Sequence, residues 1–530
     1  MNVQISWLAI LPILVVLGAA VAGTLVEAFL PYRVRRGVQV TLSLLALAVA
    51  LVAIVWRWTE MQTGNTMTPL AFHESQTGMV YPFAEDAISL ISQSIIVGCA
   101  LLAFLVIADR TQTREGAFAA SAATRPGSSA EREMTRAGRQ QTEIFPLALF
   151  ATGGMMAFVS SFNLLSLFIA LEVISLPLYV LCATARRKRL LSQEAALKYF
   201  VLGAFSSAIF LMGSAFIYGS TGSLDFAVIF TYEYRAGLST ALLTMGVIML
   251  VIGLLFKVGA APFHAWTPDV YQGAPTPITG FMAAGTKTAA FVVLGRVFLL
   301  LVGHAYSTIS IFMWIVIIAT IVIGTFAGLA QTDVKRMLAY SSIAHAGFIL
   351  IAINAISWTG SAHPGKALAA VLFYLLAYGV ATVGAFGVVT LVKERDAAGN
   401  ILGEATKLAS WAGLGQRSPM LAAAMTIFLL SFAGIPFTGG FIGKFQVFVT
   451  GLDAHMVPLV IVAVLASVVT GVFYFRLIQL MFFRAPQAQS VAVVESEGMS
   501  VVAIVLAVIG TIALGVFPGP VFDFILGSFV

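Results

Sequence analysis

Two lysines, Lys257 and Lys287, lie inside apolar stretches that otherwise look like membrane-spanning helices. A charged group within hydrocarbon costs about 2.5–3.5 kcal/mol on insertion scales, so it needs a partner, water or a function. Burial away from water shifts a lysine toward its neutral form, which lets it accept and release protons near physiological pH. These two lysines are therefore the first candidates for a proton relay.

Five other ionisable residues lie in or beside apolar segments, namely Glu172, Lys198, His264, His345 and Lys444. A lone carboxylate inside a membrane must be neutralised or paired, so we predict an ion pair between Glu172 and Lys198 on adjacent helices. Such a pair would gate the next lysine, because drawing the carboxylate away favours the neutral amine. The alternative for Lys198 is an interfacial side chain that extends to the lipid headgroups.

The two histidines and the last lysine extend this predicted relay. A free histidine titrates near neutrality, and His345 follows Ser341 and Ser342, so a proton shuttle and an ordinary helix contact are both open. His264 lies in the proline-rich stretch after Lys257, where it either connects the relay to the cytoplasm or caps a helix. Lys444 is the candidate group on the exit side.

The sequence lacks the usual motifs of bond-making chemistry. It contains no Walker, GxSxG, HExxH, haem or iron–sulfur pattern. Its two cysteines, Cys99 and Cys182, lie in apolar segments without CxxC spacing, so packing is their expected role. We therefore expect neither a cofactor nor a metal in this chain, and the residues indicate translocation of protons or cations with an unidentified energy source.

Composition defines the surroundings of these residues. The chain has 530 residues, of which 60% are hydrophobic and 10% charged, whereas soluble domains have about 25% charged residues. The mean hydropathy is +0.98, typical of an integral protein of the lipid bilayer. The net charge of +6 resides mainly in short loops, so we expect no nucleic-acid partner.

Apolar segments recur along almost the whole chain. The predicted fold is an all-α polytopic membrane protein with about 14 transmembrane helices. The spans centre near residues 18, 47, 98, 152, 174, 206, 251, 287, 319, 347, 380, 432, 469 and 510.

Two of these spans are interrupted. Span 7 runs from about Leu242 to Tyr271, too long for a straight crossing, and Pro262 should break it near Gly259. Span 12 contains AGIPFTGGFIGKF, with similar interruptions before Lys444. Interrupted, lysine-bearing spans five helices apart predict two inverted five-helix repeats, spans 4–8 and 9–13. Ordinary proline kinks are the alternative.

The predicted parts of the chain follow from this repeat. Residues 1–108 form three spans, and residues 109–143 are a polar loop that cannot bury a core and is expected to be mobile. Residues 144–302 form the first repeat, residues 303–483 the second, and residues 484–530 the last loop and span.

Basic residues predict the orientation. Most of the 29 lysines and arginines fall in loops after odd-numbered spans, and we count Lys335 among them, whereas the opposite loops hold only Arg57, Arg235 and Lys366. The positive-inside rule then places both termini outside. Arg296, near the end of its helix, is expected to extend to the headgroups.

Three stretches carry a resemblance to a known family. KVGAAPFHAWTPDVYQGAPTPITGFMAAGTKTAAF, KRMLAYSSIAHAGF and AGIPFTGGFIGKF resemble the antiporter-like subunits of respiratory complex I. The resemblance covers nearly the whole chain after residue 145. The M-type of that family usually has a glutamate where Lys444 stands, and the L-type has a long lateral helix after its last spans. The N-type fits best.

This resemblance implies both residue roles and partners. It implies a glutamate–lysine pair at Glu172 and Lys198, a broken-helix lysine at Lys257, a connecting lysine at Lys287 and a terminal lysine at Lys444. It further implies a proton-pumping NADH:quinone oxidoreductase of the bacterial plasma (inner) membrane, in which this chain does no redox chemistry. NADH, FMN, iron–sulfur clusters and quinone are then expected in partner subunits. The implied membrane neighbours are the M-type subunit and the small K- and J-type subunits.

Two other functional classes are open at this point. A subunit of a Na⁺/H⁺ antiporter would share the fold without redox coupling and would show sodium-dependent transport. A purely structural scaffold would use the buried charges only to pair helices, and neutralising them would then harm assembly rather than turnover.

Overall fold

The structure is a computed structural model. It describes residues 7–63, 82–110, 116–120, 124, 128–137, 141–235, 240–302, 306–358, 364–395, 401–485, 491–493 and 496–529. Within these ranges, twelve helices are long and apolar enough to cross a membrane. Two shorter apolar helices, Ile144–Ser160 and Pro419–Ala433, complete the fourteen predicted segments. The all-α polytopic fold is therefore confirmed.

The N-terminal part comprises α1 (Leu11–Phe29), α2 (Tyr32–Gln62) and α3 (Ala87–Ala108). The following polar loop contains a short helix, α4 (Ser129–Arg136). Phe118 and Ala119 are buried, and the Ala119 amide donates to the Thr184 carbonyl at 2.8 Å, so part of this loop packs on the bundle. Residues 111–115, 121–123, 125–127 and 138–140 of the loop lie outside the described residues, and its predicted mobility stays a prediction.

The first repeat and the second repeat follow in order. The first contains α5 (Ile144–Ser160), α6 (Leu164–Cys182), α7 (Arg189–Thr221), α8 (Phe226–Arg235), α9 (Thr240–Val258), α10 (Trp266–Gly273) and α11 (Thr276–Leu301). The second contains α12 (Tyr306–Leu329), α13 (Val334–Ile356), α14 (Pro364–Leu391), the hairpin strands β1 (Val392–Arg395) and β2 (Ile401–Glu404), η2 (Leu408–Trp411), α15 (Leu414–Arg417), α16 (Pro419–Ala433), α17 (Gly439–Asp453) and α18 (Val457–Phe483). The chain closes with β3 (Val491–Val493), α19 (Met499–Val516) and α20 (Pro518–Gly527).

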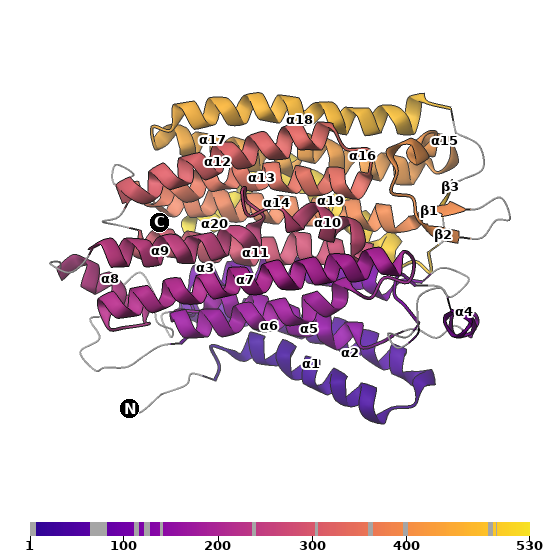
Figure 1. The fold of residues 1–530 in the computed structure, drawn as a ribbon, viewed down its shortest axis with the longest axis horizontal. Helices are drawn as coiled ribbons and strands as arrows, with labels where there is room; N and C mark the ends of the chain where they lie inside the picture. Colours follow the sequence, from indigo (N-terminus) through magenta and orange to yellow (C-terminus); the bar gives the residue numbers. More distant parts are fainter. Residues whose placement is uncertain are drawn as a thin grey trace.

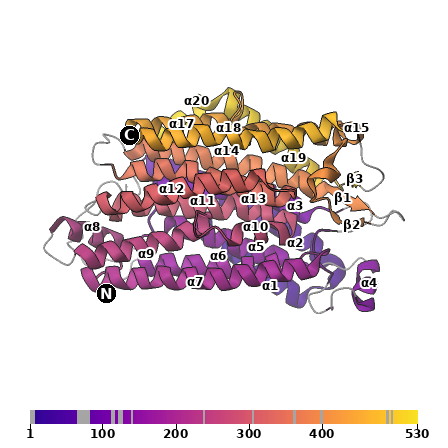
Figure 2. The same cartoon turned by 45° about the horizontal axis from the view of Figure 1, so that its top comes forward.

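The helices run nearly parallel along one axis, with the first repeat beside the second (Figure 1). Turning the molecule leaves this arrangement unchanged, with α8 at one end and the strands at the other (Figure 2). The strands form one antiparallel sheet in the order β2-β1-β3. We call this end of the bundle the hairpin end.

The starts of α6 and α13 show how the repeats are inverted. Asn163 and Asp333 cap these helices with their side chains, and each also forms an isolated β-bridge, to Asp225 and Lys407 respectively. The first bridge lies next to α8 and the second next to β2, at opposite ends of the bundle (Figure 1). The same local structure therefore occurs twice in opposite orientation.

Both predicted breaks are present. Helix α9 ends before Gly259, which has φ +76°, and α16 ends before Gly434, which has φ +81°. A left-handed residue at this position ends a helix and favours glycine. Carbonyls and amides released by the first break find partners: Trp266 Nε1 donates to the Phe256 carbonyl at 2.9 Å, and the Ala261 amide donates to Thr320 Oγ1 at 2.9 Å. These two backbone groups of the first break are therefore satisfied within the protein.

Burial separates inner from outer helices. Helices α11, α13 and α14 are the most deeply buried spans, whereas α7 and α18 expose rows of apolar side chains. Those rows match hydrocarbon or an apolar partner.

The prediction that Arg296 extends to the lipid headgroups is wrong. Its side chain is 2% exposed and makes a bidentate ion pair with Asp86, at 2.6 and 2.9 Å. A bidentate guanidinium–carboxylate contact of this kind satisfies both buried charges and joins α11 to the start of α3.

Candidate functional site

Lys257 lies at the end of α9, directly before the first break. Its side chain is buried, and Nζ donates to Ser175 Oγ of α6 at 2.7 Å. The ammonium also lies 5.7 Å from the ring centre of Tyr179 and 5.5 Å from that of Tyr199. Such cation–π contacts stabilise the charged form where water is scarce. The carboxylate of Glu172, one turn before Ser175, interacts electrostatically with this ammonium.

The predicted Glu172–Lys198 ion pair is not formed. Lys198 Nζ instead contacts Asp269 of α10 at 2.7 Å and Glu194 at 2.8 Å, and its side chain is 44% exposed. Glu172 Oε1 has no hydrogen-bond partner among the described atoms, and the lysine on which Glu172 acts is Lys257. The carboxylate is therefore associated with the broken helix rather than with the start of α7.

Lys287 connects the two repeats. It lies buried in α11, and its Nζ donates to the Ser342 carbonyl of α13 at 2.6 Å and to the hydroxyl of the same residue. Tyr271 of α10 places its hydroxyl 3.4 Å from Ser342 Oγ. The ring centre of Tyr378 lies 5.5 Å from the ammonium. A lysine of the first repeat is thus held by the second.

His345 lies between Lys287 and Lys444. It is 2% exposed, and both ammonium groups act on it electrostatically. Nδ1 lies 2.6 Å from the Tyr374 hydroxyl, and Nε2 lies 3.3 Å from the Tyr474 hydroxyl. An imidazole with a hydroxyl at each nitrogen can accept a proton on one side and release one on the other.

Lys444 lies in α17, on the far side of the second break. Its buried ammonium donates to the Ala433 carbonyl at 3.0 Å and to Ser467 Oγ at 2.8 Å. Ala433 is the last residue of α16, so the carbonyl that the break releases binds the lysine. The ring centre of Phe348 lies 5.1 Å from the Lys444 ammonium.

His264 lies in the turn between α9 and α10. Its carbonyl accepts the Thr267 amide at 2.9 Å, and its Nδ1 is buried with no hydrogen-bond partner among the described atoms. The side chain is partly buried. In the structure His264 packs at the break, and proton transfer through it stays a prediction.

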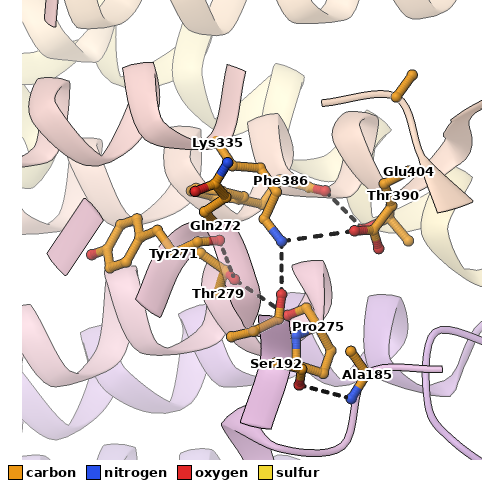
Figure 3. A network of polar contacts seen from close by, with 12 residues as sticks. Ala185, Ser192, Tyr271, Gln272, Pro275, Thr279, Lys335, Phe386, Thr390 and Glu404 are labelled. Atoms are coloured by element: carbon orange, nitrogen blue, oxygen red, sulfur yellow. Dashed lines mark hydrogen bonds and ion pairs between the residues drawn. The ribbon is translucent and has the colours of Figure 1, made fainter. Parts of the chain in front are cut away.

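The burial of one lysine was not predicted from the sequence. Lys335, expected in an inner loop, lies in the first turn of α13 with a fully buried side chain. Nζ donates to the Ala274 carbonyl at 2.7 Å and lies 3.7 Å from Glu404 Oε2 on β2 (Figure 3). The KRML stretch gives no hydropathy signal of burial, because the covering hairpin is distant in sequence.

Glu404 is a charged group of the hairpin, outside the spans. Its Oε1 lies 3.7 Å from Nζ of Lys393, its partner across β1 and β2. Burial raises the pKa of Glu404, but the charges of Lys335 and Lys393 outweigh this effect and hold the pKa below its ordinary value. The carboxylate therefore stays ionised between two lysines.

Among the described residues, no group of three or more His, Cys, Asp or Glu side chains could hold a metal ion. The candidate site is a row of buried cationic side chains joined by hydroxyl groups, aromatic rings and one imidazole. Such a row can move protons, and its members come from four separate helices, α9, α11, α13 and α17.

Comparison with known proteins defines the class. Residues 161–470 match the family model described as NADH:quinone oxidoreductase/Mrp antiporter, TM. The fold is similar to that of a chain in the Mrp complex from Dietzia sp. DQ12-45-1b, with TM-score 0.78, 18% identity, and coverage of 98% of this chain and 97% of that one. The chain is thus an antiporter-like membrane protein.

Two closer relatives specify the member. A chain of respiratory complex I from Thermus thermophilus is 31% identical, with TM-score 0.73 and coverage of 97% of this chain and 98% of that one. NADH-quinone oxidoreductase subunit N from Beutenbergia cavernae is 52% identical over 98% of this chain and 97% of its own length. The chain belongs to the family of NADH-quinone oxidoreductase subunit N, membrane subunits of complex I.

Proposed function

We propose that this chain moves protons from the cytoplasm to the outside through its buried lysines, coupled to quinone reduction in other subunits of complex I. The observation that carries the proposal is the row Lys257, Lys287 and Lys444, three buried ammonium groups each bound to a serine hydroxyl. Idle lysines at this depth would only destabilise the protein.

The chemistry assigned to the row is proton exchange. Each ammonium donates to a hydroxyl, and a hydroxyl both donates and accepts, so a proton can pass through it to water or to the next group. His345 relays between Lys287 and Lys444, with Tyr374 and Tyr474 at its two nitrogens. Glu172 acts as the counter-ion of Lys257. Lys198 and His264 lie toward the entrance.

The orientation and surroundings belong to the same proposal. The basic residues of the loops support an orientation with the hairpin end in the cytoplasm and both termini outside, in a bacterial plasma (inner) membrane. NADH, FMN, iron–sulfur clusters and quinone belong to partner subunits, and the membrane neighbours are the M-type, K-type and J-type subunits. The boundaries 1–108, 109–143, 144–302, 303–483 and 484–530 separate the functional parts of the chain.

Substitution of Lys257 by alanine in the assembled enzyme tests the proposal. A positioned proton-transfer group contributes about 10²-fold, so proton pumping in inverted membrane vesicles should fall at least about tenfold. Lys366→Gln is the matched control, because Lys366, in the first turn of α14, is exposed and pairs with Asp453 at the end of α17. Unchanged pumping and unchanged quinone reduction in Lys257→Ala would refute the relay.

A further inference from the structure

The pair Glu404–Lys335 has no part in the relay described so far. Lys335 is fully buried at the N-terminal turn of α13, where the helix dipole disfavours a cation. Its compensation comes from the Ala274 carbonyl, from Glu404 and from the nearby Asp333. A buried ammonium in so unfavourable a place depends strongly on its counter-ion.

Glu404 also borders two small cavities at the hairpin end. Each has a volume of about 60 Å³, and both are lined by Glu404, Arg187 and Ala185. A cavity needs only about 10–15 Å³ to hold a water molecule. Water from the hairpin end can therefore reach the carboxylate that faces Lys335.

Polar groups continue from Lys335 toward Lys287. The Ala274 carbonyl that binds Lys335 directly follows α10, and in that helix Tyr271 reaches Ser342, the partner of Lys287. Lys335 and Ser342 share α13, about 10 Å apart along its axis.

The Thr276 hydroxyl lies on this route. It is buried close to Glu404, and its contact with the carboxylate helps to lower the pKa of Glu404. A hydroxyl both donates and accepts, so Thr276 can link this carboxylate to neighbouring water.

We propose that Lys335 is the proton-loading site of Lys287 and that Glu404 is the positioning residue that keeps Lys335 charged. Lys335 takes a proton from water at the hairpin end and passes it through Tyr271 and water to the Lys287 amine, which the Ser342 carbonyl holds. In this step an N–H bond of Lys335 breaks and one of Lys287 forms. The inference rests on the relay proposed above.

The charges that face the pair come from several elements. Asp333 lies at the start of α13, Lys393 on β1, and Lys188 precedes α7. Among the described residues, Glu404 is the only acid that pairs with both Lys335 and Lys393. Neutralising it leaves Lys335 facing the acid Asp333 and the cations Lys393 and Lys188.

The test is Glu404→Gln in the assembled complex, assayed by proton pumping per NADH oxidised in inverted vesicles across a pH series. Pumping should fall about tenfold or more, and its alkaline limit should move to lower pH, because a carboxylate favours the charged form of a neighbouring ammonium. Glu404→Asp should recover part of the activity. Glu394→Gln is the control, since successive residues of a strand point to opposite faces, so Glu394 faces away from Lys393 and Glu404, and it accepts from Ser410.

The outcomes separate this inference from the function on which it rests. Normal pumping in Glu404→Gln, or a loss without a pH shift, overturns the inference while Lys257→Ala still abolishes pumping. Normal pumping in both variants refutes the relay itself. If the Glu404→Gln variant does not assemble, the double variant Lys335→Glu with Glu404→Lys is tested instead. It keeps the ion pair but exchanges the positions of the two charges. An assembled exchange variant that pumps normally overturns the inference, and one that does not pump supports it.

Discussion

The two broken helices solve the same problem in different ways. In the first repeat the lysine, Lys257, precedes the break and binds a side chain, Ser175. In the second repeat the lysine, Lys444, follows the break and binds, besides Ser467 Oγ, the carbonyl of Ala433, which the break itself releases. The two repeats therefore share the position of the helix break. They differ in whether the helix segment before the break or the one after it carries the lysine.

The helices that face the breaks differ in a related way. Counted from the caps Asn163 and Asp333, Glu172 and Ser342 occupy equivalent positions (163 to 172 and 333 to 342). Where the first repeat offers a carboxylate to Lys257, the second offers a hydroxyl and a carbonyl to Lys287. Lys287 is therefore held by neutral dipoles, and its charge is less firmly fixed than that of an ion-paired lysine.

The largest effect is expected for Lys287→Met, which removes the group that joins the repeats. If both repeats act as one relay, proton pumping should fall about 100-fold. Thr288→Val is the control, because Thr288 is the next residue and, within the described residues, its hydroxyl donates to the Ala284 carbonyl of its own helix. Pumping at half the normal rate in Lys287→Met would mean that the repeats work independently.

A smaller effect separates the two serines. Ser175→Ala removes the one hydrogen bond described for Lys257, whereas Ser342→Ala leaves Lys287 its bond to the Ser342 carbonyl. A hydrogen bond to a charged group contributes about 1.5–3 kcal/mol, so Ser175→Ala should reduce pumping about tenfold and Ser342→Ala clearly less. Initial pumping rates in vesicles with equal amounts of assembled enzyme decide this. Equal losses would contradict the difference between the repeats.

The glycines at the breaks give a third comparison. Both have positive φ, and an alanine there costs about 1–2 kcal/mol, so Gly259→Ala and Gly434→Ala should lower thermal stability alike. A methyl at Gly434 would lie 2.9 Å from Cδ of Lys444, whereas one at Gly259 would meet Thr267 Oγ1 at 2.8 Å. Only Gly434→Ala should therefore also lower pumping. The reverse pattern would show that Lys444 is not needed.

The smallest effect concerns two carboxylates at the hairpin end. Asp269 bridges Lys198 and Arg336, and Glu404 bridges Lys335 and Lys393. Because the pKa of Glu404 is lowered in the folded protein, its stabilising effect is present above the ordinary glutamate pKa and is lost as the pH falls through the lower, folded value.

Glu404→Gln should therefore loosen the hairpin by about 1 kcal/mol at pH 7 and have no effect in acid, as measured by hydrogen exchange of the β2 amides. Asp269→Asn should change exchange in α10 less, because its cationic partners are more exposed. A loss in Glu404→Gln that is independent of pH would contradict this assignment.

Much of the fold follows from the sequence. All fourteen segments, both helix breaks and the inverted repeat are readable there, because hydropathy, proline and glycine act locally along the chain. The burial of Lys257, Lys287 and Lys444 follows for the same reason. A lysine in the middle of an apolar segment must face the interior of the protein, because lipid hydrocarbon does not solvate its charge.

The partners of these lysines could not be read in the same way. Contacts between helices depend on the rotation of each helix about its axis, and one residue along a helix turns the side chain by about 100°. Tyr199 faces Lys257, while Lys198, one residue earlier, points outward to Asp269. That single step is why the predicted Glu172–Lys198 pair fails.

Contacts across long sequence separations were likewise decided only by the tertiary structure. Arg296 is held by Asp86 of α3, and Lys335 is covered by the hairpin that carries Glu404. Local hydropathy placed the first at a membrane surface and the second in an open loop. The sequence by itself determined which groups enter the membrane and where its helices open. Packing between distant segments determined which charges meet, because burial and counter-ions come from residues that no local pattern connects.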